Sequence, residues 1–333
     1  DLVRQMRASI LVLGPLLASK GSAKVPLPGG CAIGSRPIDL HVMVMEALGA
    51  NVTFDGGFII SSLSNEGLKG GVINFPKVSV GATESAIMTA VLAKGQTKIL
   101  NAAREPEVTD LANCLNKAGA DIKGVGTEVL IINGVKELNQ VSHSVVSDRI
   151  EAGSFAIASS ITMGNIEINN INPKNLTEFI DVLKLTGTKV EIFNNSMKVS
   201  CSHRPIPHNV VTDPYPGFPT DLQAQYMALM AIADGKTLIK ETIFENRFMH
   251  VPELMRMGAK ISINQQEAEI YGVKKLKGAK VMASDLRASM CLILGALAAS
   301  GTSEIDGLYH LDRGYENLED KLTNLGAIIK RSN

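Results

Sequence analysis

One cysteine of the chain lies in a segment rich in glycine and proline. Two glycines precede Cys31, and Arg36 follows it five residues later. A nearby guanidinium favours the thiolate over the thiol, so this cysteine can act as a nucleophile or exchange a proton. The glycines allow the segment to move as a lid that excludes water. The alternative is a small buried hydrophobic side chain, which is the interpretation we favour for Cys114 and Cys291 because both fall in helical stretches.

Arginines recur at related positions along the chain. Two kinds of helical segment recur along the chain. Four arginines precede segments of one kind, namely Arg36, Arg104, Arg247 and Arg313, and three stand at the start of segments of the other kind, namely Arg7, Arg149 and Arg287. Guanidinium groups and helix N-termini both bind phosphate and carboxylate. Because 33 basic residues balance 33 acidic ones, we expect a small anionic metabolite rather than a nucleic acid as the ligand. The alternative is a set of ordinary surface salt bridges.

Asp221 is the candidate acid–base group. It ends a proline-rich segment, residues 215–221, that leads into an apolar helical stretch. Its carboxylate can accept a proton from a substrate hydroxyl. The sequence by itself favours the other interpretation, that Thr220 or Asp221 caps the N-terminus of the helix.

The elements that must position these residues belong to an internal repeat. Each copy reads as an apolar helix, a strand, a second helix and further strands. The second helices end at glycines 68 to 71 residues apart, namely Gly49, Gly119, Gly187, Gly258 and Gly326. First helices such as residues 86–93 and 226–233 are apolar nearly all round. Such helices are buried on every side, so the repeat predicts an α/β fold with helices inside and sheets outside.

Five copies are an awkward number for a closed architecture. Six copies, as three plus three, would form two domains with approximate threefold symmetry. We therefore expect a first domain over residues 1–146, which lacks one copy, and a second domain over residues 147–333. Asp1 stands where a methionine is expected, which suggests that material upstream is missing. One copy carries an insertion around Cys31, and insertions of this kind often carry function.

The composition narrows the class of protein further. The chain has 333 residues, of which 45% are hydrophobic and 4% aromatic, and this balance is typical of a folded protein. No apolar run approaches the ~20 residues of a membrane helix, and no signal peptide opens the chain. Its four cysteines have neither zinc-site nor disulfide-framework spacing, and no Walker A or dinucleotide motif is present. We expect a cytoplasmic protein that uses no metal, cofactor, nucleic acid or membrane.

Seven segments form a distinctive set in chain order. They are residues 27–37 (LPGGCAIGSRP), 77–83 (KVSVGAT), 101–107 (NAAREPE), 218–221 (FPTD), 244–250 (FENRFMH), 285–289 (DLRAS) and 312–316 (DRGYE). As a set they resemble the enolpyruvyl transferases, in particular the branch that acts on UDP-N-acetylglucosamine. The similarity covers essentially the whole chain. The cysteine-bearing loop separates this branch from the shikimate-pathway enzymes of the same fold, which lack it.

The resemblance implies a fold and a reaction. The fold is the inverse α/β prism, with two pseudo-threefold domains and one further repeat copy upstream that carries a Lys-Asn pair for phosphoenolpyruvate. The reaction transfers the enolpyruvyl group of phosphoenolpyruvate to the 3′-hydroxyl of UDP-N-acetylglucosamine and releases phosphate, the first committed step of peptidoglycan synthesis. Two alternatives stay open: 3-phosphoshikimate as the acceptor, and a UDP-sugar-binding fragment without turnover.

The resemblance also implies roles for individual residues. Cys31 is the proton donor to phosphoenolpyruvate and the thiol that fosfomycin alkylates, and Asp221 is the base for the sugar hydroxyl or its orienting group. Arg36 and Arg313 hold the phosphate, and Arg247 and Arg287 hold the carboxylate, so that no metal is needed. The implied UDP-N-acetylglucosamine contacts are Arg7, Arg36, Pro37, Ile38, Asp39, Leu40, Lys77, Val78, Ser79, Val80, Asp221 and Ile243.

Overall fold

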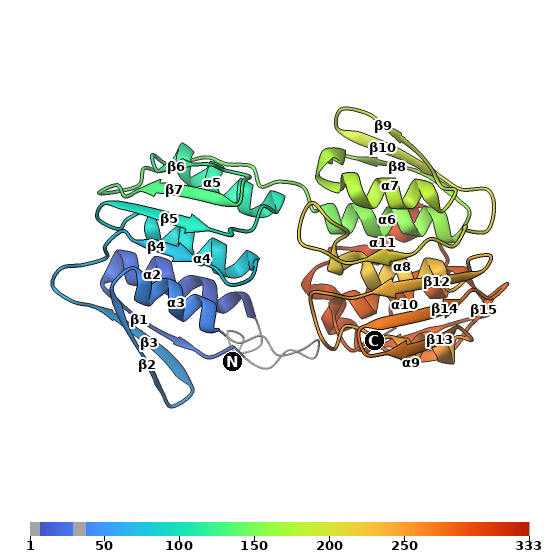
Figure 1. Cartoon of the computed structure of the whole chain (residues 1–333). Helices are drawn as coiled ribbons and strands as arrows, with labels where there is room; N and C mark the ends of the chain where they lie inside the picture. Colours follow the sequence, from blue (N-terminus) through green and yellow to red (C-terminus); the bar gives the residue numbers. More distant parts are fainter. Residues whose placement is uncertain (1–6, 29–37, 333) are drawn as a thin grey trace. The chain divides into compact units, whose positions relative to one another are not determined.

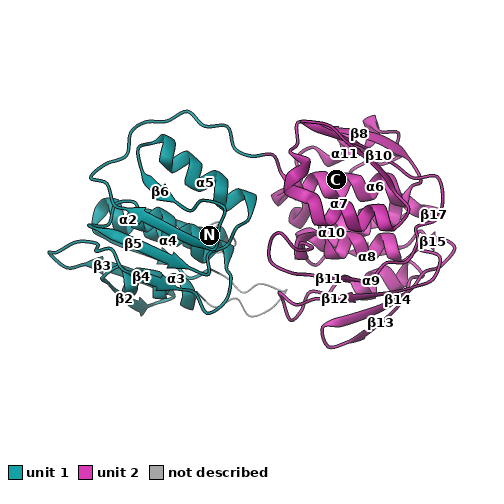
Figure 2. Ribbon diagram, turned by 45° about the horizontal axis from the view of Figure 1, so that its top comes forward, with its two compact units in different colours: residues 1–31, 35–146 teal, residues 32–34, 147–333 magenta. Residues whose placement is uncertain are grey.

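The computed structural model describes residues 7–28 and 38–332 of the chain (Figure 1). These residues form two compact units, one that extends to Val146 and one that begins at Ser147 (Figure 2). Each unit has a hydrophobic core of its own. No helix among the described residues has the length and apolar character to cross a membrane.

The first unit contains two copies of the repeat. The first copy comprises η1 (Arg7–Val12), α2 (Leu13–Lys20), β1 (Ser22–Pro26), α3 (Asp39–Ala47), β2 (Ala50–Asp55) and β3 (Phe58–Leu63). The second comprises β4 (Val72–Asn74), α4 (Val80–Ala90), β5 (Gln96–Leu100), α5 (Pro106–Lys117), β6 (Asp121–Lys123) and β7 (Val129–Asn133). The strands form two sheets with the orders β1-β3-β2 and β4-β5-β7-β6, antiparallel except where β4 joins β5.

The second unit contains three copies. The first comprises α6 (Arg149–Ile161), β8 (Asn165–Asn169), η2 (Pro173–Leu176), α7 (Thr177–Leu185), β9 (Lys189–Ile192) and β10 (Ser196–Ser200). The next comprises β11 (Val210–Val211), η3 (Thr220–Leu222), α8 (Gln223–Met230), β12 (Lys236–Lys240), α9 (Val251–Arg256), β13 (Lys260–Asn264) and β14 (Glu267–Tyr271). The last comprises β15 (Leu276–Lys277), β16 (Lys280–Met282), α10 (Leu286–Ala298), β17 (Ala299–Ser300), β18 (Glu304–Asp306), η4 (Leu308–Arg313) and α11 (Leu318–Asn324). Their sheets have the orders β8-β10-β9, β11-β12-β14-β13, β15-β17 and β16-β18.

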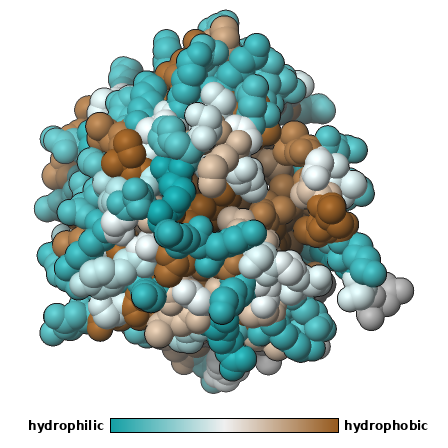
Figure 3. Space-filling view, turned by 90° about the vertical axis from the view of Figure 1, so that its right-hand side faces the viewer, coloured by the Kyte–Doolittle hydropathy of each residue, from teal (hydrophilic) through white to brown (hydrophobic). Residues whose placement is uncertain are grey.

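The first helices of four copies, α4, α6, α8 and α10, are mostly buried, as the apolar pattern predicts. Helix α2 differs, since only three of its eight residues are buried. All eight residues of α8 are buried, and so are eleven of the thirteen residues of α6. In the second unit α6, α8 and α10 pack against one another, and the sheets lie outside them (Figure 1). The face shown in Figure 3 is largely hydrophilic, with apolar side chains gathered in places between the polar ones. The prediction of an α/β fold with internal helices is confirmed.

The glycine after each second helix has the backbone conformation that the sequence predicts. The φ angles of Gly49, Gly119, Gly187, Gly258 and Gly326 lie between 87° and 101°, a region in which a side chain is strained. The starts of the first helices differ from expectation. Helix α4 begins at Val80 rather than near Ala86, because the Ser79 hydroxyl accepts an amide hydrogen and so caps the helix six residues earlier.

Candidate functional site

A cluster of aromatic rings anchors the turn that carries Asp221. This residue lies in η3, directly before α8. The ring of Phe218 packs edge-on against Tyr226 at 5.4 Å and against Phe179 at 6.0 Å between centroids. The backbone carbonyl of Asp221 accepts a hydrogen bond of 2.9 Å from Gln225. The ring contacts and the Gln225 hydrogen bond together fix the position of the turn.

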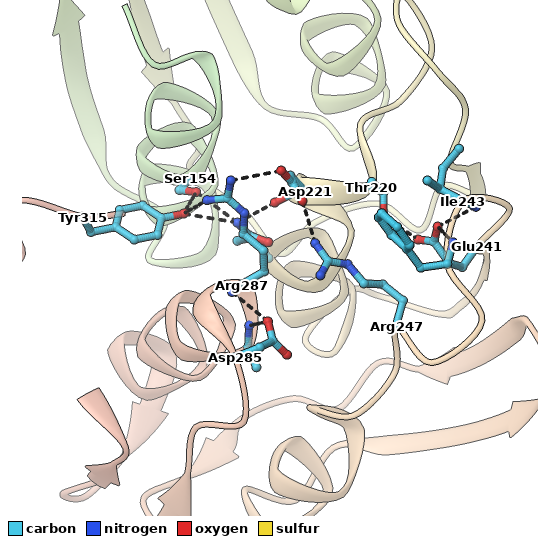
Figure 4. A network of polar contacts seen from close by, with 12 residues as sticks. Ser154, Thr220, Asp221, Glu241, Ile243, Arg247, Asp285, Arg287 and Tyr315 are labelled. Atoms are coloured by element: carbon cyan, nitrogen blue, oxygen red, sulfur yellow. Dashed lines mark hydrogen bonds and ion pairs between the residues drawn. The ribbon is translucent and has the colours of Figure 1, made fainter. Parts of the chain in front are cut away.

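The Asp221 carboxylate is held by two arginines (Figure 4). Arg247 Nη2 donates to Asp221 Oδ1 at 2.6 Å, and Arg287 Nη2 donates to Oδ2 at 3.0 Å. The Arg247 side chain is buried at 5% exposure and that of Arg287 is largely buried at 14%, whereas the Asp221 side chain is 42% exposed. A carboxylate between two cations, open on one side, can meet a ligand.

Charge pairing dominates the protonation state of this cluster. Burial would raise the pKa of Asp221, but Arg287 and Arg247 outweigh it and hold the pKa well below its usual range. Burial would lower the pKa of Arg287, but Asp221 outweighs it and raises the pKa above its ordinary value. Asp221 and Arg287 are therefore both charged near neutral pH.

The interpretation of Asp221 or Thr220 as a helix cap is wrong. The N-cap position of η3 is Pro219, which makes no side-chain cap bond, and the Thr220 hydroxyl donates to Glu241 at 3.0 Å. Serine, threonine and aspartate at such a position usually accept hydrogen bonds from the next turn. Here the guanidiniums, 26 and 66 residues away in the chain, take both carboxylate oxygens.

A buried carboxylate positions the segment that leads to Arg247. Glu241 Oε2 accepts the Thr220 hydroxyl, and its Oε1 accepts the backbone amides of Ile243 at 2.8 Å and Phe244 at 3.2 Å. Ile243 is one of the predicted UDP-sugar contacts. Glu241 therefore joins the backbone of that contact to the turn of Asp221, a role that sequence reasoning missed because nothing in the local pattern distinguishes this glutamate.

Helix α10 positions Arg287 by its capped N-terminus. Asp285 accepts the amide hydrogens of Arg287 at 2.9 Å and Ala288 at 3.1 Å, so the helix begins at a defined residue. Arg313, by contrast, ends η4 with an exposed side chain. Its neighbour Asp312 is bound by Arg331 through two hydrogen bonds of 2.6 and 3.1 Å. The hydrogen bonds from Arg331 thus hold the backbone next to Arg313 in place.

Two helix starts in the first unit carry most of the other predicted contacts. Residues 77–80 lie at the start of α4, with Lys77 exposed and Ser79 as the cap. Ile38, Asp39 and Leu40 lie at the start of α3. Leu40 is buried in the core, so only its backbone is available to a ligand. The first turns of the two helices lie side by side, since a Cβ at Gly81 would be 3.5 Å from His41 Cε1. Paired helix N-termini suit a diphosphate.

For the remaining predicted residues, the side chains lie outside the part of the chain that the structure describes. Cys31, Arg36 and Pro37 lie outside the described residues, and so does the side chain of Arg7. Within the described ranges no three His, Cys, Asp or Glu side chains come together in a way that could hold a metal ion.

Comparison with known proteins identifies the family. The family model described as EPSP synthase (3-phosphoshikimate 1-carboxyvinyltransferase) matches residues 1–322, and the chain belongs to this family. Solved structures agree in fold. The enolpyruvyl transferase NikO from Streptomyces tendae gives a TM-score of 0.88 at 25% identity over 99% of this chain and 78% of that one. EPSP synthase from Acinetobacter baumannii gives 0.73 at 20% identity, over 99% and 79%. The predicted enolpyruvyl-transferase fold is confirmed.

Sequence relatives are more specific than the family model. The UDP-N-acetylglucosamine 1-carboxyvinyltransferase of Geobacter metallireducens is 56% identical over 333 residues, which is 99% of this chain and 79% of that protein. The protein of the same name from Zymomonas mobilis is 53% identical over 331 residues, 99% of this chain and 78% of that protein. The resemblance to this branch of the family is therefore confirmed.

Proposed function

We propose that the protein transfers the enolpyruvyl group of phosphoenolpyruvate to the 3′-hydroxyl of UDP-N-acetylglucosamine and releases phosphate. The observation that carries the proposal is the convergence of Arg247 and Arg287 on Asp221. These are the two arginines expected to hold the substrate carboxylate and the one carboxylate expected to meet the sugar hydroxyl. The relatives above 50% identity, named for this reaction, support the same acceptor.

The arginines are arranged to hold a second carboxylate beside the first. Each arginine binds Asp221 through its Nη2 alone, and a guanidinium has five N–H donors. Arg247 Nε is buried and makes no hydrogen bond to the described residues. The donors that remain can bind phosphoenolpyruvate as a bidentate pair. A phosphoenolpyruvate molecule bound by both arginines in this way would have its reacting carbon near Asp221.

Substrate binding would change the basicity of Asp221. In the free protein the two guanidiniums hold the pKa of Asp221 low, so the carboxylate is a weak base that orients the hydroxyl by accepting its hydrogen. A bound substrate carboxylate neutralises part of that positive charge, and the pKa of Asp221 then rises toward its ordinary value. The carboxylate therefore becomes a better base when phosphoenolpyruvate is in place.

The other roles follow the order of bond changes. The Cys31 thiol gives a proton to C3 of phosphoenolpyruvate while the sugar oxygen bonds to C2, and loss of a C3 proton with departure of phosphate then restores the double bond. Arg36 and Arg313 stabilise the phosphate as its charge develops. The starts of α3 and α4 bind the UDP-sugar, with Arg7, Pro37 and Ile243 as further contacts.

In the cell this reaction would be the first committed step of peptidoglycan synthesis. It would take place in the cytoplasm and would serve cell-wall formation, cell shape and division. The division of the chain into a first domain, 1–146, and a second, 147–333, is part of the same proposal. Because arginines supply the positive charge, the proposed reaction needs no metal and no cofactor.

Phosphate release tests the proposal directly. The full-length protein is incubated with phosphoenolpyruvate and either UDP-N-acetylglucosamine or 3-phosphoshikimate, and inorganic phosphate is measured. Phosphate release with UDP-N-acetylglucosamine as the acceptor, and none with 3-phosphoshikimate, supports the proposal. Release with 3-phosphoshikimate would assign the other acceptor. Binding of the UDP-sugar without release from either pair would refute enzymatic turnover.

A further inference from the structure

A buried chain of hydroxyl groups lies behind Arg287. Tyr315 follows η4, is 3% exposed, and its Oη lies 2.8 Å from Ser154 Oγ in α6 and 3.5 Å from Arg287 Nη1. Ser154 Oγ donates its only proton to the Ile150 carbonyl at 2.8 Å. Tyr315 must therefore donate to Ser154, and the lone pairs of its oxygen are left to face Arg287.

Gln225 connects this chain to Asp221. Its side chain is fully buried, and its Nε2 donates to the Asp221 carbonyl at 2.9 Å. The same Nε2 lies 3.2 Å from Ser154 Oγ and 3.4 Å from Tyr315 Oη. The hydroxyl chain thus contacts the Arg287 guanidinium directly (Figure 4). Through Gln225 it also reaches the turn of Asp221, whose carboxylate Arg287 binds.

We propose that Tyr315 is a positioning residue, whose hydroxyl fixes the orientation of the Arg287 guanidinium for binding the carboxylate of phosphoenolpyruvate. This inference rests on the proposed function, in which Arg287 binds that carboxylate. An arginine side chain has several rotatable bonds and loses entropy when it is fixed. A guanidinium already fixed by Tyr315 and Asp221 does not pay that cost when substrate binds, so it binds more tightly.

The hydroxyl can be tested apart from the ring. Tyr315 belongs to the hydrophobic core of the second unit, and Tyr315→Phe keeps this packing while it removes the contact to Arg287. Tyr226 is a matched control. Its ring packs on Phe218 in the turn of Asp221, and Tyr226→Phe keeps that ring contact. Its hydroxyl, also buried, donates to the His208 carbonyl at 2.8 Å and has no contact with Arg287 or Asp221. Tyr226→Phe therefore loses one buried hydrogen bond of the same kind.

Steady-state kinetics of the full-length protein separate positioning from general loss of structure. For Tyr315→Phe we expect the KM of phosphoenolpyruvate to rise about five- to tenfold while kcat stays within about twofold, because the substrate carboxylate does not change during the reaction and its binding is uniform. The KM of UDP-N-acetylglucosamine should not change. Tyr226→Phe should match the wild type in all three constants. Equal kinetics in the two variants, or a fall of kcat without a change in KM, would overturn the inference.

A second variant tests the chain itself. Ser154→Ala removes the acceptor of the Tyr315 proton, so it should also raise the KM of phosphoenolpyruvate. If both residues act through one chain, the double variant should raise this KM by less than the product of the two single effects. A double variant whose effect equals that product would overturn the proposed chain.

Measuring phosphoenolpyruvate binding directly tests the role of Tyr315 separately from the proposed function. If the wild type releases no phosphate from its two substrates, the proposed function fails. Calorimetric titration with phosphoenolpyruvate then decides the role of Tyr315 by itself. Weaker binding by Tyr315→Phe than by Tyr226→Phe supports positioning. Equal affinity, or no binding by the wild type, overturns it.

Discussion

Replacing Asp221 by asparagine removes the negative charge between Arg247 and Arg287 while keeping the shape of the side chain. An amide oxygen can accept from one guanidinium, but the amide nitrogen cannot accept from the other. Two buried cations are then left side by side with one neutral partner. Loss of one partner of a buried pair costs about 3–5 kcal/mol, and an exposed pair contributes about 0–1 kcal/mol.

Because the site is partly exposed, the free-energy cost of Asp221→Asn should lie between those two limits. Arg247 is 5% exposed but the carboxylate is 42% exposed, so we expect a loss of about 2 kcal/mol in the free energy of unfolding. For a unit of this size this lowers the melting temperature by roughly 4–8 °C. The pKa of Asp221 is lowered by folding, so its stabilisation is present above the unfolded pKa of about 3.9 and is lost as the pH falls below it. The difference between variant and wild type should therefore shrink below about pH 4.

The same substitution should act in opposite directions on binding and turnover. Without the Asp221 charge the arginines attract an incoming carboxylate more strongly. A unit charge about 6 Å away at an effective dielectric constant near 40 corresponds to about 1.4 kcal/mol, or tenfold tighter binding of phosphoenolpyruvate. The kcat should fall about 100-fold or more, because no group orients or deprotonates the sugar hydroxyl.

Calorimetry with phosphoenolpyruvate, chemical denaturation and phosphate release measure the three effects. Asp213→Asn is the control, since Asp213 is exposed in the segment just before this turn. Weaker binding of phosphoenolpyruvate together with unchanged stability would show that Asp221 does not neutralise the two arginines, and the reasoning would be refuted.

Three further predictions concern other titratable groups. Cys31→Ser should abolish turnover at neutral pH and labelling by fosfomycin, and mass spectrometry that finds the label on Cys201 instead would refute the assignment. Burial lowers the pKa of His250 to about 4, so the folded state resists protonation, and stability should fall by about 2–3 kcal/mol between pH 7 and pH 4.5; His250→Leu should lose this dependence in denaturation curves, and an unchanged pH profile would contradict it. Burial and two neighbouring glutamates raise the pKa of Glu84 to about 7, so its ionisation lowers the stability of the fold as the pH rises from about 4.5 through 7. Glu84→Gln should therefore raise the free energy of unfolding by about 1–2 kcal/mol at pH 8 and by little at pH 5. An equal gain at both pH values, or the same gain for the exposed control Glu46→Gln, would refute this.

Much of the fold was predictable because the features that encode it are local. An all-apolar helix such as α8 must be buried whatever surrounds it. A glycine such as Gly258 ends a helix through its own backbone conformation. Helix starts were predicted less well, since α4 begins before its apolar stretch, at a cap that one serine provides. The set of seven motifs in chain order by itself indicates the family.

The candidate site depended on the sequence for its residue types and on the tertiary structure for their partners. Arg247, Arg287 and Asp221 could be named from the chain, but local preference assigned the aspartate to a cap. Only the packing of α6, α8 and α10 brings together groups as far apart as Ser154 and Tyr315, 161 residues distant. Backbone conformation responds to near neighbours in the chain, whereas the charge and hydrogen bonding of a buried side chain depend on whichever elements pack around it.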